Sequence, residues 1–280
     1  MGEPRRAKPA RDRVPAVEAT GHDNIATAFA ASAGRAALMP YLMAGFPDME
    51  TSLRIGLAYA DNGADLVELG VPYSDPLADG PVIHAAGTAA LRAGATFAGV
   101  LEVAEALSRR LPVVLMCYVN LVLARTPDGF CEAARRAGVS GLIVPDLPLE
   151  EAGEIAAACE RHGIALVPLV APTTPEDRLH EIGARARGFL YTVSVTGTTG
   201  ERTSGEDEYR SILARVKEHA DVPVAIGFGI ATPEQAAAAA RAGADGVIVG
   251  TRLVRAAAES DDPAAAVGEL VAGLHAGLIG

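Results

Sequence analysis

The sequence predicts one α/β domain, a closed (β/α)8 TIM barrel with an extra helix before the first strand. Eight short apolar runs alternate along the chain with stretches of helical periodicity. The runs are apolar on both faces, as a parallel sheet covered by helices requires. A short echo also recurs, in which a glycine that ends a helix leads directly into a strand. The echo occupies residues 63–70, 138–144 and 243–250.

The elements follow in order. Residues 1–20 mix Arg, Pro, Glu and Ala without apolar periodicity, so we expect a disordered N-terminal extension, with the catalytic barrel domain over 21–280. Asp23 or Asn24 is expected to cap a short helix through Ala31. The expected strands are 38–43, 64–69, 112–118, 141–144, 164–169, 188–193, 222–227 and 245–249. The expected helices are 49–62, 82–92, 97–110, 128–137, 149–162, 175–185, 206–219, 233–241 and 251 to the end.

Composition excludes several classes of protein. The net charge of −11 disfavours binding to nucleic acid or to an anionic membrane. Charged residues or prolines interrupt every apolar block, so no membrane span is expected, and the basic N-terminus lacks the apolar region of a signal peptide. The three cysteines are an odd number without CxxC spacing and are interpreted as reduced core residues. A cytoplasmic location is expected.

The strand at 64–69 carries Glu68 near its C-terminal end. A carboxylate in an apolar strand is costly unless a site pairs or solvates it, and barrel enzymes keep their chemistry at this end of their strands. Asp75 and Asp79 follow in a loop that prolines stiffen. The sequence therefore indicates a carboxylate site, and the alternative is one buried structural Glu beside an Asp-rich turn.

Glycine-rich loops follow the last three predicted strands and reach the same face of the barrel. Glycine lets the backbone approach an anion, and free N–H groups at a helix start bind phosphate. We therefore predict a phosphate site, with simple turns and caps as the alternative explanation. Its candidate residues are Gly197, Thr199, Gly200, Gly227, Phe228, Gly229, Gly250 and Thr251.

Other chemistries lack candidates. Lys8 and Lys217 are the only lysines, one in the tail and one on a helix, so no Schiff-base lysine is available at a strand end. The six histidines lack metal-ligand spacing at strand ends, so no metal site is predicted. What remains is acid-base catalysis by carboxylates on a phosphorylated substrate that supplies its own electron sink.

Residues 68–81 closely resemble the signature of the tryptophan synthase α-subunit family. Supporting matches lie at residues 40–41, 44–47, 116–120, 145–148, 191–200 and 227–229, and the resemblance covers about residues 22–275. It implies a carbon-carbon lyase that cleaves indole-3-glycerol phosphate by a retro-aldol reaction to indole and glyceraldehyde 3-phosphate.

The resemblance also implies residue roles. Glu68 is the expected general acid-base, Asp79 the acceptor of the indole N–H, and Tyr191 a neighbour that positions Glu68 and the substrate. Tyr41 and apolar strand ends would pack the indole, and the glycine-rich loops would hold the phosphate. Asp75 is expected at the interface with a partner.

The expected partner is a β subunit in an α2β2 complex for tryptophan biosynthesis. Pyridoxal phosphate would belong to that subunit, and this chain would carry no cofactor. Two alternatives stay open. One is a stand-alone indole-3-glycerol phosphate lyase of a specialised pathway, and the other is a non-catalytic barrel that activates a partner.

Overall fold

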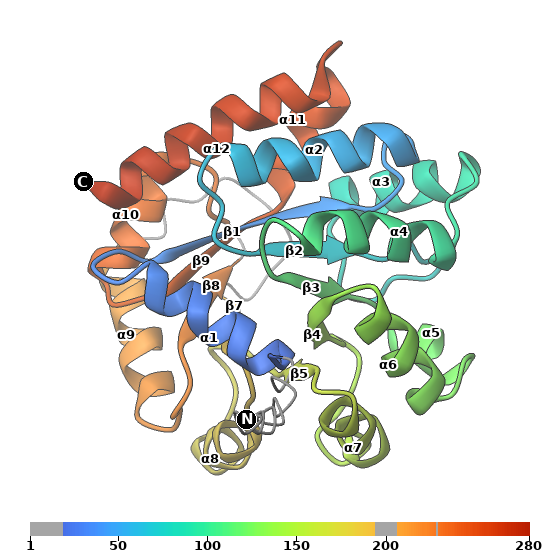
Figure 1. The fold of residues 1–280 in the computed structure, drawn as a ribbon. Coiled ribbons are helices and arrows are strands. Elements are labelled where there is room, and N and C mark those ends of the chain that lie inside the picture. Colours follow the sequence, from blue (N-terminus) through green and yellow to red (C-terminus); the bar gives the residue numbers. More distant parts are fainter. Residues whose placement is uncertain (1–18, 194–205, 228) are drawn as a thin grey trace, which may run out of the picture.

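The computed structural model describes residues 19–193, 206–227 and 229–280 (Figure 1). Its strands are all parallel, in the order β5-β4-β3-β2-β1-β9-β8-β7-β6. Their bounds are β1 Ala37–Met43, β2 Val67–Gly70, β3 Val113–Met116, β4 Val139–Ile143, β5 Ala165–Val167, β6 Leu169–Val170, β7 Leu190–Val193, β8 Val224–Gly227 and β9 Gly246–Val249. The predicted TIM barrel is confirmed.

Helices surround this sheet (Figure 1). Their bounds are α1 Gly21–Ala31, α2 Met49–Asp61, α3 Pro81–Arg92, α4 Phe97–Ser108, α5 Val119–Leu123, α6 Pro127–Arg136, α7 Gly153–Arg161, α8 Glu176–Arg185, α9 Glu206–Lys217, α10 Pro233–Arg241, α11 Thr251–Glu259 and α12 Pro263–Ile279. None of these helices in the described ranges is long and apolar enough to cross a membrane.

The fifth predicted strand is divided at Pro168. Its first part, β5, pairs with β4, and its second part, β6, pairs with β7. Proline has no N–H to give to a ladder, but its carbonyl still accepts the N–H of Tyr191 at 3.0 Å. Because β5 and β6 are one run of chain, the two edges of the sheet meet there. The eight predicted strands therefore become nine segments of a closed barrel.

Helix α1 closes the N-terminal opening of the barrel (Figure 1). Ile25 is fully buried among side chains of the barrel interior. The expected cap at Asp23 or Asn24 is wrong by one turn, because Thr20 is the N-cap. Thr20 and Asp23 bond reciprocally in a capping box, which satisfies two amides at the helix start. Almost all of the expected extension lies outside the described residues.

The final helical stretch is two helices rather than one. Asp262 caps α12 by accepting the N–H of Ala265, and Pro263 occupies the first helical position, where its missing N–H costs nothing. The third predicted strand is shorter than expected and ends at Met116, since the chain turns into α5 at Val119. The Asp146 carboxylate accepts the Val119 N–H at 2.9 Å and supports this turn.

Asp65 joins two strands at the N-terminal end of the barrel. Its carboxylate accepts the N–H of Leu38 at 2.8 Å and binds both terminal nitrogens of Arg35, at 2.6 and 2.7 Å. The Asp65 and Arg35 side chains are 12% and 17% exposed. This is a bidentate ion pair largely shielded from water, and removing one partner would leave the other charge without its counter-ion.

Asp245 repeats the arrangement in another copy of the glycine echo. It accepts the N–H of Val224 at 2.8 Å and binds Lys217 at 2.8 Å. Its side chain is 39% exposed, so water can replace much of the hydrogen bonding and charge pairing that the carboxylate provides.

Asp65→Ala is expected to lower the free energy of unfolding by about 3 kcal/mol. It leaves the buried Leu38 N–H without its acceptor and removes the carboxylate from the largely shielded Arg35 guanidinium, which keeps its bond to the Ala36 carbonyl. Asp245→Ala is the matched control and should cost about 1 kcal/mol. Urea unfolding at pH 7 measures both. Equal losses would mean that burial does not set the strength of this contact.

Candidate active site

Glu68 lies on β2 beside Tyr41 of β1, at the C-terminal end of the barrel strands. Side chains alternate along a strand, and Val67 and Leu69 pack outward against helices, so Glu68 points to the barrel interior. The side chain is 1% exposed, and its Oε2 has no hydrogen-bond partner among the described residues. A buried carboxyl oxygen without a partner is rare and needs an explanation, and a catalytic role is one.

Burial is the main reason that the pKa of Glu68 is raised to about 8, and the charge of Asp79 adds to the effect. Removal from water disfavours the ionised form, and a second negative charge nearby acts in the same direction. The carboxyl group is therefore protonated at neutral pH. A neutral carboxylic acid can give a proton to a bound substrate.

Asp79 comes from the loop between β2 and α3 and is held by Tyr118. The Tyr118 hydroxyl donates to Asp79 Oδ1 at 2.8 Å and accepts the N–H of Ala78 at 3.0 Å. Burial raises the pKa of Asp79, while the bond from Tyr118 opposes the rise by favouring the carboxylate. Asp79 is thus the group suited to remain ionised beside a neutral Glu68.

Tyr118 is a candidate site residue to which the sequence analysis gave no role. It stacks on Tyr73 with ring centroids 5.3 Å apart, and the Tyr73 hydroxyl accepts from Asn120 at 2.9 Å. These contacts join the β2–α3 loop to α5. A tyrosine just after a strand was the available signal, but its pairing with Asp79 is a tertiary contact.

Tyr41 and Tyr191 form the inner wall of the site, and each lies against a glycine. A Cβ on Gly70 would come within 2.1 Å of the Tyr41 hydroxyl, and a Cβ on Gly227 within 2.4 Å of the Tyr191 hydroxyl. Burial raises the pKa of both tyrosines well above the usual value, so both stay neutral. The charge of Glu68 acts on both rings, which puts these groups in one neighbourhood.

The predicted phosphate end is partly described. Gly229 is exposed with φ +81°, and an added Cβ would meet nothing within 4 Å. Gly250 is the N-cap of α11 and makes no side-chain cap bond, so Thr251 begins a helix whose first amides are available to an anion. Gly250 also lies beside Tyr41. Four further predicted residues, Gly197, Thr199, Gly200 and Phe228, lie outside the described residues.

The described part of the chain thus brings together Glu68, Asp79, Tyr41 and Tyr191, with Gly250 at the edge. Asp75 is exposed in the β2–α3 loop and stands apart from this group. In the described ranges, no cluster of three or more His, Cys, Asp or Glu side chains is arranged to hold a metal ion. The arrangement offers one neutral acid, one carboxylate and an apolar aromatic wall.

Comparison with known proteins gives consistent matches. The family model for the tryptophan synthase alpha chain matches residues 28–274. The tryptophan synthase alpha chain of Prochlorococcus marinus (strain MIT 9313) is 51% identical over 79% of this chain and 82% of its own length. That of Gluconacetobacter diazotrophicus is 50% identical over 85% of this chain and 88% of its own.

Solved structures agree. Mycobacterium tuberculosis tryptophan synthase superposes with a TM-score of 0.85 at 39% identity, over 93% of this chain and 99% of that one. Tryptophan synthase subunit alpha from Legionella pneumophila gives a TM-score of 0.83 at 33% identity, over 92% and 98%. The chain therefore belongs to the tryptophan synthase alpha chain family.

Proposed function

We propose that this chain cleaves indole-3-glycerol phosphate to indole and glyceraldehyde 3-phosphate, with Glu68 as the proton carrier. The observation that carries the proposal is the buried Glu68 carboxyl, whose pKa is raised to about 8. A group that must first donate a proton and then recover one is best served by a pKa near the working pH.

The proton balance follows from this state. Neutral Glu68 protonates C3 of the indole, and the positive charge spreads over the ring to the ring nitrogen. The Glu68 carboxylate then takes the proton of the side-chain hydroxyl while the bond to C3 breaks and its electron pair returns to the ring. The products are indole and an aldehyde, and Glu68 is protonated again for the next turnover.

Asp79 would accept the indole N–H and stabilise the charge that develops on the ring. Tyr118 would hold Asp79 as a carboxylate in the correct orientation, through the bond of 2.8 Å. Tyr41 and Tyr191 would pack the ring and keep water from Glu68. The amides of Gly229, Gly250 and Thr251, with those of Gly200 outside the described residues, would receive the phosphate.

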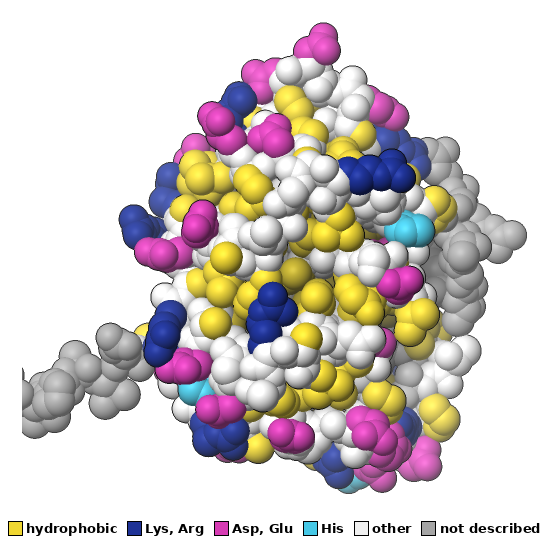
Figure 2. Space-filling view, turned by 90° about the vertical axis from the view of Figure 1, so that its right-hand side faces the viewer, with side chains coloured by type: hydrophobic (Ala, Val, Ile, Leu, Met, Phe, Trp, Pro, Cys, Tyr) yellow, Lys and Arg dark blue, Asp and Glu magenta, His cyan; other side chains and the backbone are white. Residues whose placement is uncertain are grey.

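A β subunit is the proposed partner, in an α2β2 complex, and the pyridoxal phosphate that joins indole to serine belongs to it. The β2–α3 loop and α5 are tied together by Tyr118 and Asn120, and both expose a leucine: Leu77 is 83% exposed and Leu123 52%. Apolar side chains also gather across the middle of the flank that carries α4, α5 and α6 (Figure 2). Apolar surface of this kind favours a protein partner, with Asp75 at the contact.

Indole release from the purified chain, without and with a β subunit, tests the function. We expect slow release alone and strong activation by the partner. Glu68→Gln is the control and should abolish release while the substrate still binds, since the amide keeps the shape of the acid and cannot give its proton. If the β subunit leaves the rate of indole release unchanged, the stand-alone lyase is favoured. If no indole is released under either condition, the non-catalytic barrel is favoured.

The pH dependence of kcat/KM reports the state of Glu68 in the free enzyme. Because the acid form starts the reaction, kcat/KM should be level near neutral pH and fall tenfold per pH unit above about 8, where Glu68 ionises. A steady-state profile from pH 5 to 10 measures this. A rise in kcat/KM towards pH 8 would instead show that Glu68 begins the reaction as a carboxylate.

Asp79→Ala should lower kcat by about 100- to 1000-fold, the usual cost of losing one preorganised electrostatic contact. Tyr118→Phe should lower it by about 10- to 100-fold, because the ring stays but the hydroxyl that donates to Asp79 and accepts the N–H of Ala78 is lost. The double variant should be no slower than Asp79→Ala. Tyr73→Phe keeps the stacked ring and is the matched control. If the losses of kcat in the two single variants add in the double variant, Tyr118 does not act through Asp79.

A further inference from the structure

Cys131 on α6 and Cys159 on α7 face each other across the contact between the two helices. Their sulfur atoms are 3.7 Å apart, which is van der Waals contact, and the residues are 0% and 1% exposed. Neither belongs to the site around Glu68. Two thiols aimed at one another need only a modest approach to reach the bonded distance of about 2.05 Å.

A second contact joins the same two helices, α6 and α7. The Asp128 carboxylate at the start of α6 binds Arg161 at 2.8 Å and His162 at 3.1 Å, at the end of α7. Cys131 follows Asp128 by one helical turn, and Cys159 precedes His162 by the same step. Side chains three residues apart lie on one helix face, so the ion pair and the thiol pair are consecutive contacts and hold each other in register.

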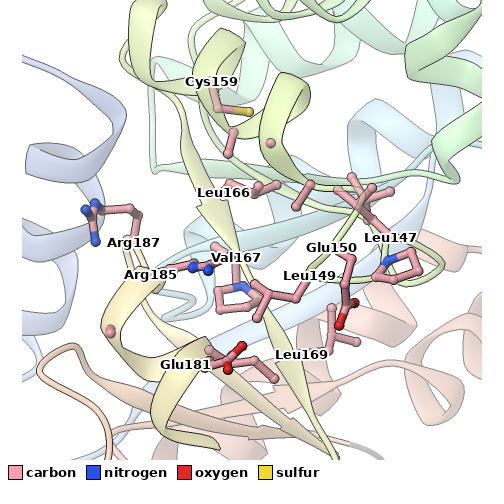
Figure 3. A pocket seen from close by; sticks show the side chains of 18 of the residues that line it. Leu147, Leu149, Glu150, Cys159, Leu166, Val167, Leu169, Glu181, Arg185 and Arg187 are labelled. Atoms are coloured by element: carbon pink, nitrogen blue, oxygen red, sulfur yellow. The ribbon is translucent and has the colours of Figure 1, made fainter. Parts of the chain in front are cut away.

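The other flank of α7 is open. A groove of about 850 Å³ separates α7 from α8, and Cys159 is part of its wall (Figure 3). Leu166 and Leu169 of the divided fifth strand line it as well. A helix with an unpacked flank can move towards α6 by an ångström without compressing its neighbours on that side. Cys159 therefore touches the groove on one side and the Cys131 thiol on the other.

We infer that Cys131 and Cys159 are a reversible oxidation site that forms a disulfide between α6 and α7. A peroxide oxidises one of the two thiols to a sulfenic acid and is reduced to water. The other sulfur then attacks the oxidised sulfur, the S–S bond forms and the S–O bond breaks. The leaving hydroxide takes the proton of the attacking thiol and becomes a second water. A dithiol reductant reverses the reaction.

The experiment exposes the full chain, freshly reduced, to hydrogen peroxide and counts thiols after unfolding in urea. The count should fall from three to one. Peptide mapping without reductant should find Cys131 joined to Cys159 in monomeric chain, and dithiothreitol should restore three thiols. Survival of all three in the folded chain, at a peroxide level that oxidises the unfolded chain, would overturn the inference.

Cys117 provides the control. It is 1% exposed like the pair, but it makes no hydrogen bond to a sulfur in the described part of the chain. Cys117→Ser should still form the disulfide, whereas Cys131→Ser should form none within the chain. A linked peptide that contains Cys117, or a disulfide between two chains, would contradict the assignment. The wild-type peptide map decides the question even if a variant fails to fold.

Discussion

The exclusion of water from one carboxyl group is the constraint on which the site depends. The pKa of Glu68 is raised from 4.5 to about 8, which corresponds to about 5 kcal/mol of lost stability for the ionised form. That is comparable to the whole stability of many domains, so the barrel must be closed and well packed to hold such a group. Three features close the barrel around this group. They are the buried side chain of Ile25, the sheet edges that meet at Pro168, and the rings of Tyr41 and Tyr191.

The two carboxylates differ because they come from different kinds of element. Glu68 lies on β2, which is paired with a strand on each side, and its side chain is buried. Asp79 lies on a loop, is less buried, and depends on a hydroxyl donated from the segment after β3. Environment thus separates an acid from a carboxylate, the usual sign of an acid-base pair. The same loop carries Leu77, which is part of the surface proposed for the partner.

The sequence was sufficient for the fold, since runs that are apolar on both faces and follow a helix-terminating glycine have few other solutions. The division at Pro168 and the cap at Thr20 were not predicted, although a proline within an apolar run and a Thr-x-x-Asp spacing were the available signals. The part that Tyr118 plays could not be predicted, because it depends on a contact 39 residues away that only the closed barrel creates. The phosphate loops stay predictions, since GxG spacing does not fix where the amides point.

The proposed mechanism requires Glu68 to be neutral at physiological pH. Carbon-13 NMR of chain labelled at the glutamate carboxyl carbon, assigned by comparison with Glu68→Gln, would follow that one group through a titration. The mechanism predicts a midpoint near pH 8, far above that of the exposed glutamates. A midpoint near 4.5 would show that the carboxyl is already ionised at neutral pH and would contradict its role as the initial proton donor.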